Sequence, residues 1–479
     1  MRMDAPSEDV PDRLARLGPF HDMLILALAT WMTACATPEA TTMTRPSSPL
    51  MASGGPPGAI RHVFLVSVDG LLPEAYTAPD KHGLRVPHLR RMRADGWWAP
   101  GLQVVFPSVT YPNHTSMVTG VHPARHGIHG NRAFDPLRMN QGGWNWYAED
   151  IQVRTIWGQA HQAGYRTAMM SWPVTVGAEA TLRVPEFWRA GTPDDAKLVR
   201  ALSAPEDLFE GLLRRFPDVE DRLTPPNYSD AGGTDVIVYA IEQYKPHLLL
   251  HHIVNVDHEQ HGHGPWSSEA KQAVEESDRL LGRIIEAAQR AGIWDQTVMV
   301  VASDHGFLRI HSTIRPNVLL RREGLITVNE DGRVKEWQAS ALSNGGSAYV
   351  YLHPDAPPDA ARRARNVFAE RPGIRRVLDE DAIHELDGDP GALLALDAEE
   401  GFAFADDLDG PPMGPTSERY VATHGYDPRR PGMKASLLAF GPPIRTRRLD
   451  GATLVDIAPT IAEWLGLDLG ETDGQSLAP

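Results

Sequence analysis

The chain has 479 residues, of which 42% are hydrophobic and 23% charged, a composition typical of globular proteins. Its formal net charge of -16 argues against a groove for a nucleic-acid polymer, because such grooves carry a basic face. The charge does not exclude small phosphate substrates, since bound metal ions would dominate the field around them. The length suffices for one large core or two domains.

The first 35 residues resemble an export signal. An apolar run at residues 23–37 is too short for a comfortable membrane span and fits a signal core. Cys35, the only cysteine, stands behind Met32-Thr33-Ala34, a sequence similar to a bacterial lipoprotein cleavage box. We therefore predict export to the periplasm or cell surface, with a lipid anchor at Cys35 as the only membrane attachment. The alternative is a buried helix that ends in an incidental cysteine; the long, acid-rich stretch before it also suits a start codon placed too far upstream.

A segment rich in Pro, Thr, Ser and Gly follows at residues 36–59 and predicts a flexible tether, since it cannot bury a core. We expect the catalytic domain at residues 60–479. Because no other cysteine is present, a disulfide framework is excluded.

Three apolar runs of β type each finish on an acidic residue: Asp69, Asp257 and Asp304. Continuous apolar strands are typical of parallel sheets covered on both faces, and ligands bind there beyond the carboxyl ends of the strands. A buried charge is costly unless it is paired or binds a metal. The sequence therefore predicts an α/β fold with a mostly parallel central sheet, helices on both faces, and a cation site at one edge.

Residues 106–131, FPSVTYPNHTSMVTGVHPARHGIHGN, place Thr110 just before a Tyr-Pro pair. Pro112 suits the first turn of a helix, which we expect to run to about Val118 and to stop at Gly120. Thr110 then lies at a helix N-terminus, where free N–H groups and the helix dipole favour an anion. An N-cap is the commoner role for such a threonine, but nearby metal ligands favour a nucleophile.

Histidines complete two sets of ligands. His261 lies four residues after Asp257, and His424 lies in the sequence ATHGYDP. Zinc is bound by such mixtures of imidazole and carboxylate groups. We assign one metal to Asp257, His261 and His424, and the other to Asp69, Asp304, His305 and the oxygen of Thr110.

The blocks FPSVTYPNH…HGIHGN, VDHEQHGHGP, SDHGF and THGYDP resemble, in order, the signature blocks of the nucleotide pyrophosphatase/phosphodiesterases of the alkaline phosphatase superfamily. The resemblance extends from about Arg61 to Gly474 and implies an alkaline-phosphatase-like fold. It implies that the two ligand sets carry two zinc ions and that Thr110 is the nucleophile; manganese or iron could compete for the sites. It further implies that Asn131 hydrogen-bonds a non-bridging phosphoryl oxygen.

The resemblance also implies an aromatic side chain that stacks on a nucleobase, in the loop at residues 172–188. Phe187 and Trp188 are both candidates, and Tyr111, next to the nucleophile, is expected to form the opposite face of the clamp. The alternative for all three is ordinary core packing. Arg183, Arg189 and Lys197 lie near this loop in the sequence.

The rest of the chain gives weaker signals. Helical spacing predicts a helix at residues 267–292, with Asp278 and Arg283 on a solvated face. A less regular insertion at residues 313–421 contains an expected strand, AYVYLHP, and an expected helix, DAARRARNVFAERPG.

Together these patterns predict a hydrolase for phosphodiester or pyrophosphate bonds of nucleotides or related small molecules, acting through a phosphoryl-threonine intermediate. One metal would activate Thr110 and the other would steady the leaving oxygen, with Asn131 and the N–H of Tyr111 holding the phosphoryl charge. A sulfatase is excluded, because the nucleophile block lacks the required cysteine. A phosphate monoesterase, a phosphonoacetate hydrolase and an inactive, surface-tethered binding protein remain alternatives.

Overall fold

The computed structural model describes residues 60–189, 192 and 194–479. The predicted signal at residues 1–35, with Cys35, and the predicted tether at residues 36–59 lie outside the described residues. Within the described part of the chain, no helix combines the length and the apolar character needed to cross a membrane.

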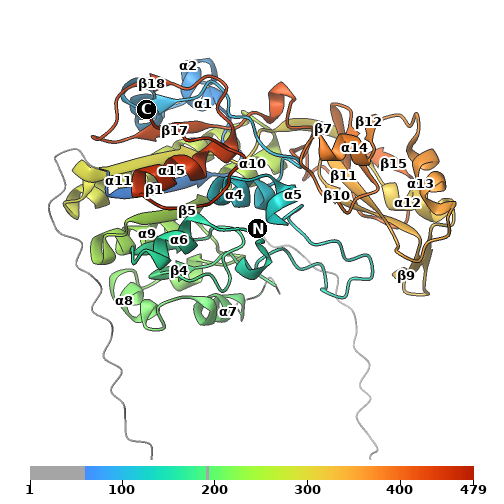
Figure 1. Ribbon diagram of the computed structural model, residues 1–479, viewed down its shortest axis with the longest axis horizontal. Helices are drawn as coiled ribbons and strands as arrows, with labels where there is room; N and C mark the ends of the chain where they lie inside the picture. Colours follow the sequence, from blue (N-terminus) through green and yellow to red (C-terminus); the bar gives the residue numbers. More distant parts are fainter. Residues whose placement is uncertain (1–59, 190–191, 193) are drawn as a thin grey trace, which may run out of the picture. The chain divides into compact units, whose positions relative to one another are not determined.

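An eight-stranded sheet forms the centre of the described unit, with the strand order β18-β2-β17-β6-β1-β5-β3-β4 (Figure 1). The central strand β1 (His62–Val68) pairs in parallel with both β5 (Leu248–Ile253) and β6 (Thr297–Ala302). All residues of these three strands are buried, which explains why each reads as a continuous apolar run. The other strands are β2 (Trp97–Trp98), β3 (Thr167–Met170), β4 (Leu182–Val184), β17 (Leu437–Phe440) and β18 (Arg447–Arg448).

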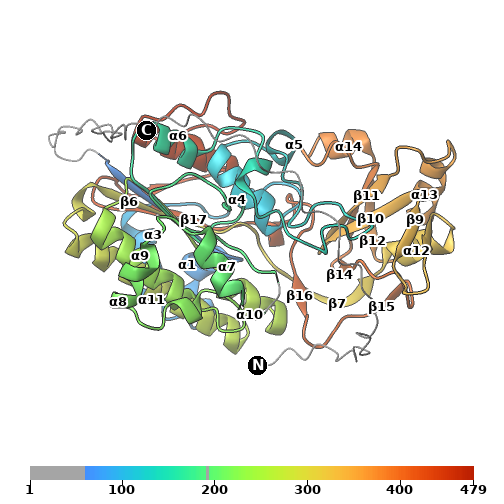
Figure 2. The same ribbon diagram turned by 90° about the horizontal axis from the view of Figure 1, so that it is seen from below.

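The two faces of the sheet are covered by different helices (Figure 2). Alternate residues of β1 point to opposite faces: Val63 and Leu65 enter one core, whereas Phe64 and Val66 enter the other. The first core contains residues of α4 (Thr110–Thr119), α6 (Ile156–Gln162) and α15 (Ile457–Leu465). The second contains residues of α3 (Pro87–Asp95), α9 (Asp230–Tyr244) and α11 (Ser268–Arg290). The predicted α/β architecture, with a mostly parallel sheet between two helical layers, is confirmed.

Helix α11 confirms the prediction for residues 267–292, but one of its faces was misjudged. Asp278 is 1% exposed, and its carboxylate accepts hydrogen bonds from the backbone N–H groups of His88 (3.2 Å) and Leu89 (2.7 Å) at the start of α3. Arg283 pairs with Asp235 of α9. The predicted solvated face is therefore wrong at these positions, because α11 lies between two other helices and a second side of it is covered.

Residues 308–423 form smaller sheets beside the central one, at the right of Figure 1. Four strands pair antiparallel in the order β10-β11-β13-β12, and β7 joins β14, β15 and β16. The expected strand corresponds to β11 and the expected helix to α13. The strands are β7 (Leu308–Ile314), β8 (Ile326–Val328), β9 (Val334–Trp337), β10 (Ala339–Asn344), β11 (Ser347–Leu352), β12 (Ile374–Leu378), β13 (Leu394–Ala398), β14 (Gly401–Phe404), β15 (Met413–Pro415) and β16 (Ala422–Thr423).

The remaining helices are short. They are α1 (Glu74–Thr77), α2 (Pro79–His82), α5 (Pro123–His126), α7 (Asp194–Leu202), α8 (Leu208–Arg215), α10 (Asn255–His263), α12 (Pro316–Arg322), α13 (Ala360–Phe368) and α14 (Glu380–His384). Among them, α10 positions part of the site, because it begins two residues after the end of β5.

Candidate metal centre and substrate site

The carboxyl ends of β1, β5 and β6 bring the predicted acidic residues together. Asp69 directly follows β1, and Asp304 follows the end of β6 by two residues. Strand β5 ends at Ile253, four residues before the predicted end at Asp257, because Val254 already has helical backbone angles and α10 begins there. Asp257 therefore stands in the first turn of a helix, and His261 lies one turn later on the same side.

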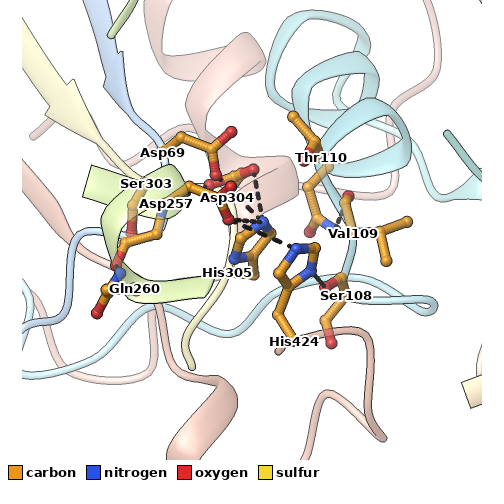
Figure 3. A network of polar contacts seen from close by, with 12 residues as sticks. Asp69, Ser108, Val109, Thr110, Asp257, Gln260, Ser303, Asp304, His305 and His424 are labelled. Atoms are coloured by element: carbon orange, nitrogen blue, oxygen red, sulfur yellow. Dashed lines mark hydrogen bonds and ion pairs between the residues drawn. The ribbon is translucent and has the colours of Figure 1, made fainter. Parts of the chain in front are cut away.

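Asp257, His261 and His424 converge as predicted. Oδ1 of Asp257 lies 3.4 Å from Nε2 of His261 and 3.5 Å from Nε2 of His424. The other nitrogen of each ring is held by a backbone carbonyl: that of Ala422 for His261 (2.9 Å) and that of Ser108 for His424 (3.1 Å). These contacts orient both Nε2 atoms towards Asp257, an arrangement common among metal-binding histidines. Figure 3 shows His424 held between Ser108 and Asp257 in this way.

A second group surrounds His305. Its Nε2 lies 3.2 Å from Oδ1 of Asp69 and 3.1 Å from Oδ2 of Asp304. Oδ1 of Asp257 is also only 4.0 Å away, so Asp257 lies between the two groups. The other oxygen of Asp304 accepts the backbone N–H of Gly70 at 3.1 Å, which ties the end of β6 to the end of β1.

Several atoms that face one another in this cluster lack hydrogen-bond partners. Oδ1 of Asp69, Oδ1 of Asp257, Oδ2 of Asp304 and Nε2 of His305 are all buried, and none of them has a hydrogen-bond partner. Burial, together with the charge of Asp257, raises the pKa of Asp69 to about 7. Burial also raises the pKa of Asp304 and of Asp257. Carboxylates in this position need a cation to remain ionised, and their combination with imidazole nitrogens fits zinc, manganese or iron.

Thr110 begins α4 at a helix start without a side-chain cap, since the preceding residue is Val109. The helix continues to Thr119 and ends at Gly120, whose φ of 75° is left-handed, in agreement with the prediction. One turn into the helix, His114 places Nδ1 2.8 Å from the Thr110 carbonyl and 3.7 Å from Oδ2 of Asp304. The first turn of α4 therefore lies against the His305 group, and Figure 3 draws Thr110 beside it. The approach of His114 to Asp304 is not indicated by the local sequence.

Asn131 lies beside the start of the same helix. Its Oδ1 accepts the backbone N–H of Tyr111 at 2.9 Å. The two groups expected to hold a phosphoryl oxygen together are thus bonded to each other. In this arrangement the side-chain NH2 of Asn131 is the group that can donate to a ligand.

The aromatic residues near Thr110 differ in their exposure. Tyr111 is 0% exposed and packs edge-on against Trp144 (5.2 Å), so the expectation that its ring faces a base is corrected. Phe187 is 9% exposed and packs on Trp146. Trp188 is half-buried and contacts Trp144, also half-buried, at 5.0 Å. The sequence analysis missed Trp144 and Trp146, although the stretch WNWY could have marked them.

His252 of β5 is a further residue that was not predicted from the sequence. It is 1% exposed; its Nε2 lies 3.1 Å from Oδ2 of Asp69, and its Nδ1 lies 3.3 Å from Oε2 of Glu186. Burial alone would lower the pKa of His252, but the contacts with Asp69 and Glu186 outweigh it and raise the pKa well above the usual value. His252 therefore links Asp69 to the loop that carries Phe187 and Trp188. A histidine pair inside an apolar strand was the available signal.

Of the three basic side chains near this loop, Arg183 and Lys197 are bound away from the aromatic rings, whereas Arg189 lies beside one of them. Arg183 donates to the backbone carbonyls of Ala178 and Leu202. Arg189 lies 5.8 Å from the Trp146 ring, and Lys197 pairs with Asp194 at 2.7 Å.

The fold and this arrangement of acidic residues, histidines and Thr110 define an alkaline-phosphatase-like α/β protein. The chain belongs to the type I phosphodiesterase / nucleotide pyrophosphatase family, because the sequence model of that family matches residues 63–427.

Curated relatives are similar at low identity. Ectonucleotide pyrophosphatase/phosphodiesterase family member 1 of Rattus norvegicus is 27% identical over 252 residues, 51% of this chain and 24% of the relative. The bis(5'-adenosyl)-triphosphatase enpp4 of Xenopus laevis is 23% identical over 423 residues, 85% of this chain and 78% of the relative. This chain thus spans about a quarter of the length of some relatives and most of others.

Solved structures share the fold. Human ectonucleotide pyrophosphatase / phosphodiesterase 5 has a TM-score of 0.61 at 18% identity, covering 86% of this chain and 97% of that one. An inactive variant of the murine protein in complex with AMP has the same TM-score and identity, with 87% and 97% covered.

Proposed function

We propose that this protein is a hydrolase with two metal ions that cleaves phosphodiester or pyrophosphate bonds of nucleotides or related small molecules. One observation carries the proposal: unpaired, buried carboxylate oxygens of Asp69, Asp257 and Asp304 converge beside the uncapped helix start that bears Thr110. Membership of the phosphodiesterase family supports the reaction class.

The metals would occupy the two groups already described. Asp257, His261 and His424 would hold one ion, and Asp69, Asp304, His305 and the Thr110 oxygen the other. Zinc suits these ligands, and other divalent metals can compete. When bound, the ions supply the positive charge that favours a threonine alkoxide, steadies the leaving oxygen and makes water a better nucleophile.

The residues of the chain would carry out two displacements. Thr110 Oγ1 attacks phosphorus, the bond from phosphorus to the leaving oxygen breaks, and that oxygen leaves as an alcohol or phosphate after taking up a proton. Water then attacks the phosphoryl-threonine, the bond from Oγ1 to phosphorus breaks, and Thr110 regains its proton. The side-chain NH2 of Asn131, at the positive end of α4, would donate to a non-bridging oxygen as its charge grows.

A diester suits the surroundings better than a monoester. A monoester carries an additional charge that calls for a cation beyond the metals, and Arg183 and Lys197 are engaged elsewhere. Arg189, over the Trp146 ring, is the cation whose substitution would test this preference. A diester has a second organic arm, for which the half-buried rings of Trp144 and Trp188 would provide a wall. Relatives named for nucleotide substrates, and a related structure with AMP, support a nucleoside as one arm.

Export belongs to the proposal as well. The protein would reach the periplasm or cell surface with Cys35 as its lipid-modified first residue, acting on small molecules and not on nucleic-acid polymers. Mass spectrometry of the native product tests this directly, and residues 1–34 still attached to the mature, active protein would contradict it.

A substrate panel tests the reaction. We expect metal-replete protein to cleave bis(p-nitrophenyl) phosphate or a nucleotide p-nitrophenyl ester with a higher kcat/KM than p-nitrophenyl phosphate. If the monoester is the better substrate by about tenfold or more, roughly 1.4 kcal/mol in transition-state binding, the phosphodiesterase proposal is wrong.

A further inference from the structure

A second polar site lies where the insertion meets the segment that follows His424. We call it the arginine pocket, a cavity of about 230 Å³ lined by Arg375, Arg376, Asp427, Arg429, Arg430 and Pro431. None of its lining residues belongs to the proposed metal centre.

An irregularity in β12 explains why two consecutive arginines share the pocket. Successive side chains of a regular strand point to opposite faces, so Arg375 and Arg376 would ordinarily diverge. Along β13, however, Ile374 pairs with Ala398 and Arg376 with Asp397, which leaves Arg375 as an extra residue. Such a β-bulge re-aims side chains, and here both guanidinium groups line the same cavity.

The arginines outnumber the carboxylates that bind them. Arg430 lies 2.6 Å from Asp397, and Arg429 lies 2.6 Å from Asp427. Arg375 lies 3.3 Å from Asp397, and Arg376 lies 3.3 Å from Asp427. These contacts are longer, and each involves one guanidinium nitrogen. Four positive groups thus share two directly bound negative ones, in a chain whose net charge is -16.

Many donors in the pocket remain available. A guanidinium carries five N–H donors, and the side chains of Arg375 and Arg376 are 49% and 41% exposed. The Nε of Arg430 is buried and has no hydrogen-bond partner. Guanidinium groups bind phosphate oxygens in pairs with good geometry, and a cavity of this size admits a phosphate group with part of its substituent.

We propose that the arginine pocket binds a phosphate-bearing anion at a site separate from the metal centre. The two sites are joined by a short segment: Asp427 lies three residues after His424, and the Tyr426 carbonyl accepts the hydroxyl of Ser108, whose own carbonyl contacts His424. The test must therefore separate binding in the pocket from binding at the metals.

Equilibrium dialysis of the metal-loaded full chain against labelled inorganic phosphate provides that separation. We expect two classes of site in the wild type, of which only one is displaced by a non-hydrolysable diester. The double variant Arg375→Ser/Arg376→Ser should lose the other class or bind it at least tenfold more weakly, while kcat/KM for bis(p-nitrophenyl) phosphate stays unchanged. Arg333→Ser/Arg362→Ser removes the same charge from exposed positions of the same insertion and should retain both classes.

Equal phosphate binding in the wild type and in the Arg375→Ser/Arg376→Ser variant would overturn the proposal. Should that variant fail to fold, the single change Arg375→Gln decides the question, since it removes a half-exposed side chain with one long ion pair. The phosphate could belong to a soluble compound or to a lipid headgroup. Vesicles of phosphatidylcholine with phosphatidic acid distinguish them. Sedimentation of the protein with vesicles that depends on Arg375 and Arg376 assigns the headgroup, and binding of inorganic phosphate without such sedimentation assigns the soluble anion. If neither ligand binds in a manner that depends on these arginines, the proposal is overturned.

Discussion

Two groups of buried carboxylates in this protein differ in the hydrogen bonds that their oxygens accept. At the edge of the central sheet, the facing oxygens of Asp69 and Asp304 have no hydrogen-bond donors. At the arginine pocket, Asp427 in its lining and Asp397 buried behind it each accept hydrogen bonds from guanidinium groups and from a backbone N–H. Burial raises the pKa of Asp69 to about 7, whereas the bonds from Arg429 outweigh burial at Asp427 and hold its pKa below the usual value. The first group therefore offers carboxylate oxygens to a cation, whereas the second is bound by its arginines and can offer donors to an anion.

The largest expected effect tests whether the first group serves catalysis. Thr110→Ala should lower kcat for bis(p-nitrophenyl) phosphate by about 10,000-fold or more, because no other hydroxyl replaces the nucleophile. Circular dichroism should stay nearly unchanged, since the side chain caps nothing in α4. Metal content should fall little, because Asp69, Asp304 and His305 would still hold the ion that Thr110 also contacts. Near-normal turnover in this variant would sink the assignment of Thr110.

Removing a shared ligand should have the next largest effect. Asp257→Ala should lower the metal content from two ions per chain to about one or fewer, since its Oδ1 lies between both groups. Glu259→Ala is the matched control on the same helix, because Glu259 pairs with His263, at 3.6 Å, and not with a proposed metal ligand among the described residues. Mass spectrometry of metals in both variants checks this. Equal losses of metal in the two variants would contradict the assignment of Asp257 as a ligand.

A smaller effect is expected behind the ligands. His252→Gln should weaken binding of the metal held by Asp69 by about 10–100-fold, the usual consequence of losing a group that orients a ligand. His251→Gln changes the neighbouring buried histidine, which contacts Met170 and Thr234 instead, and should leave metal affinity intact. Metal titration of both variants separates the loss of a group that orients Asp69 from a general loss of protein stability. Identical affinities in the two variants would assign His252 a purely structural role.

The smallest effect concerns the substrate's organic arm. Trp188→Ala should lower kcat/KM for a nucleotide ester by up to ~100-fold, the loss of about 1–3 kcal/mol of stacking on the base. The loss for bis(p-nitrophenyl) phosphate should be smaller, because its aromatic arm is smaller than a nucleoside. Phe187→Leu should spare both substrates, because Phe187 packs inward on Trp146. A uniform loss for all substrates in Trp188→Ala would argue against stacking. Tyr111→Ala is a poor probe, since it would empty a core position.

Much of the candidate metal centre at the carboxyl ends of the central strands could be predicted from the sequence. The runs before Asp69 and Asp304 are mainly apolar because both faces of β1 and β6 are buried, so the ends of the strands could be predicted. Pro112 and Gly120 marked helix α4 by ordinary helix chemistry. The end of β5 was misplaced because valines continue past Ile253 into the first turn of α10.

The remaining features depend on packing between distant segments. Glu186 and His252 lie 66 residues apart and meet only because β3 pairs beside β5. Trp144, from another loop, packs against the buried ring of Tyr111, which no local pattern indicates. The shared direction of Arg375 and Arg376 depends on the bulge in β12, which arises from pairing with β13.

Titration of zinc into chelated protein tests the central claim most directly. The full chain is stripped by exhaustive chelation, and its hydrolysis of bis(p-nitrophenyl) phosphate is followed as zinc is returned. We predict no activity in the stripped protein, and a rise that reaches its plateau at about two equivalents per chain. Full activity after chelation, or a plateau at a single equivalent, would contradict a hydrolytic centre with two metals.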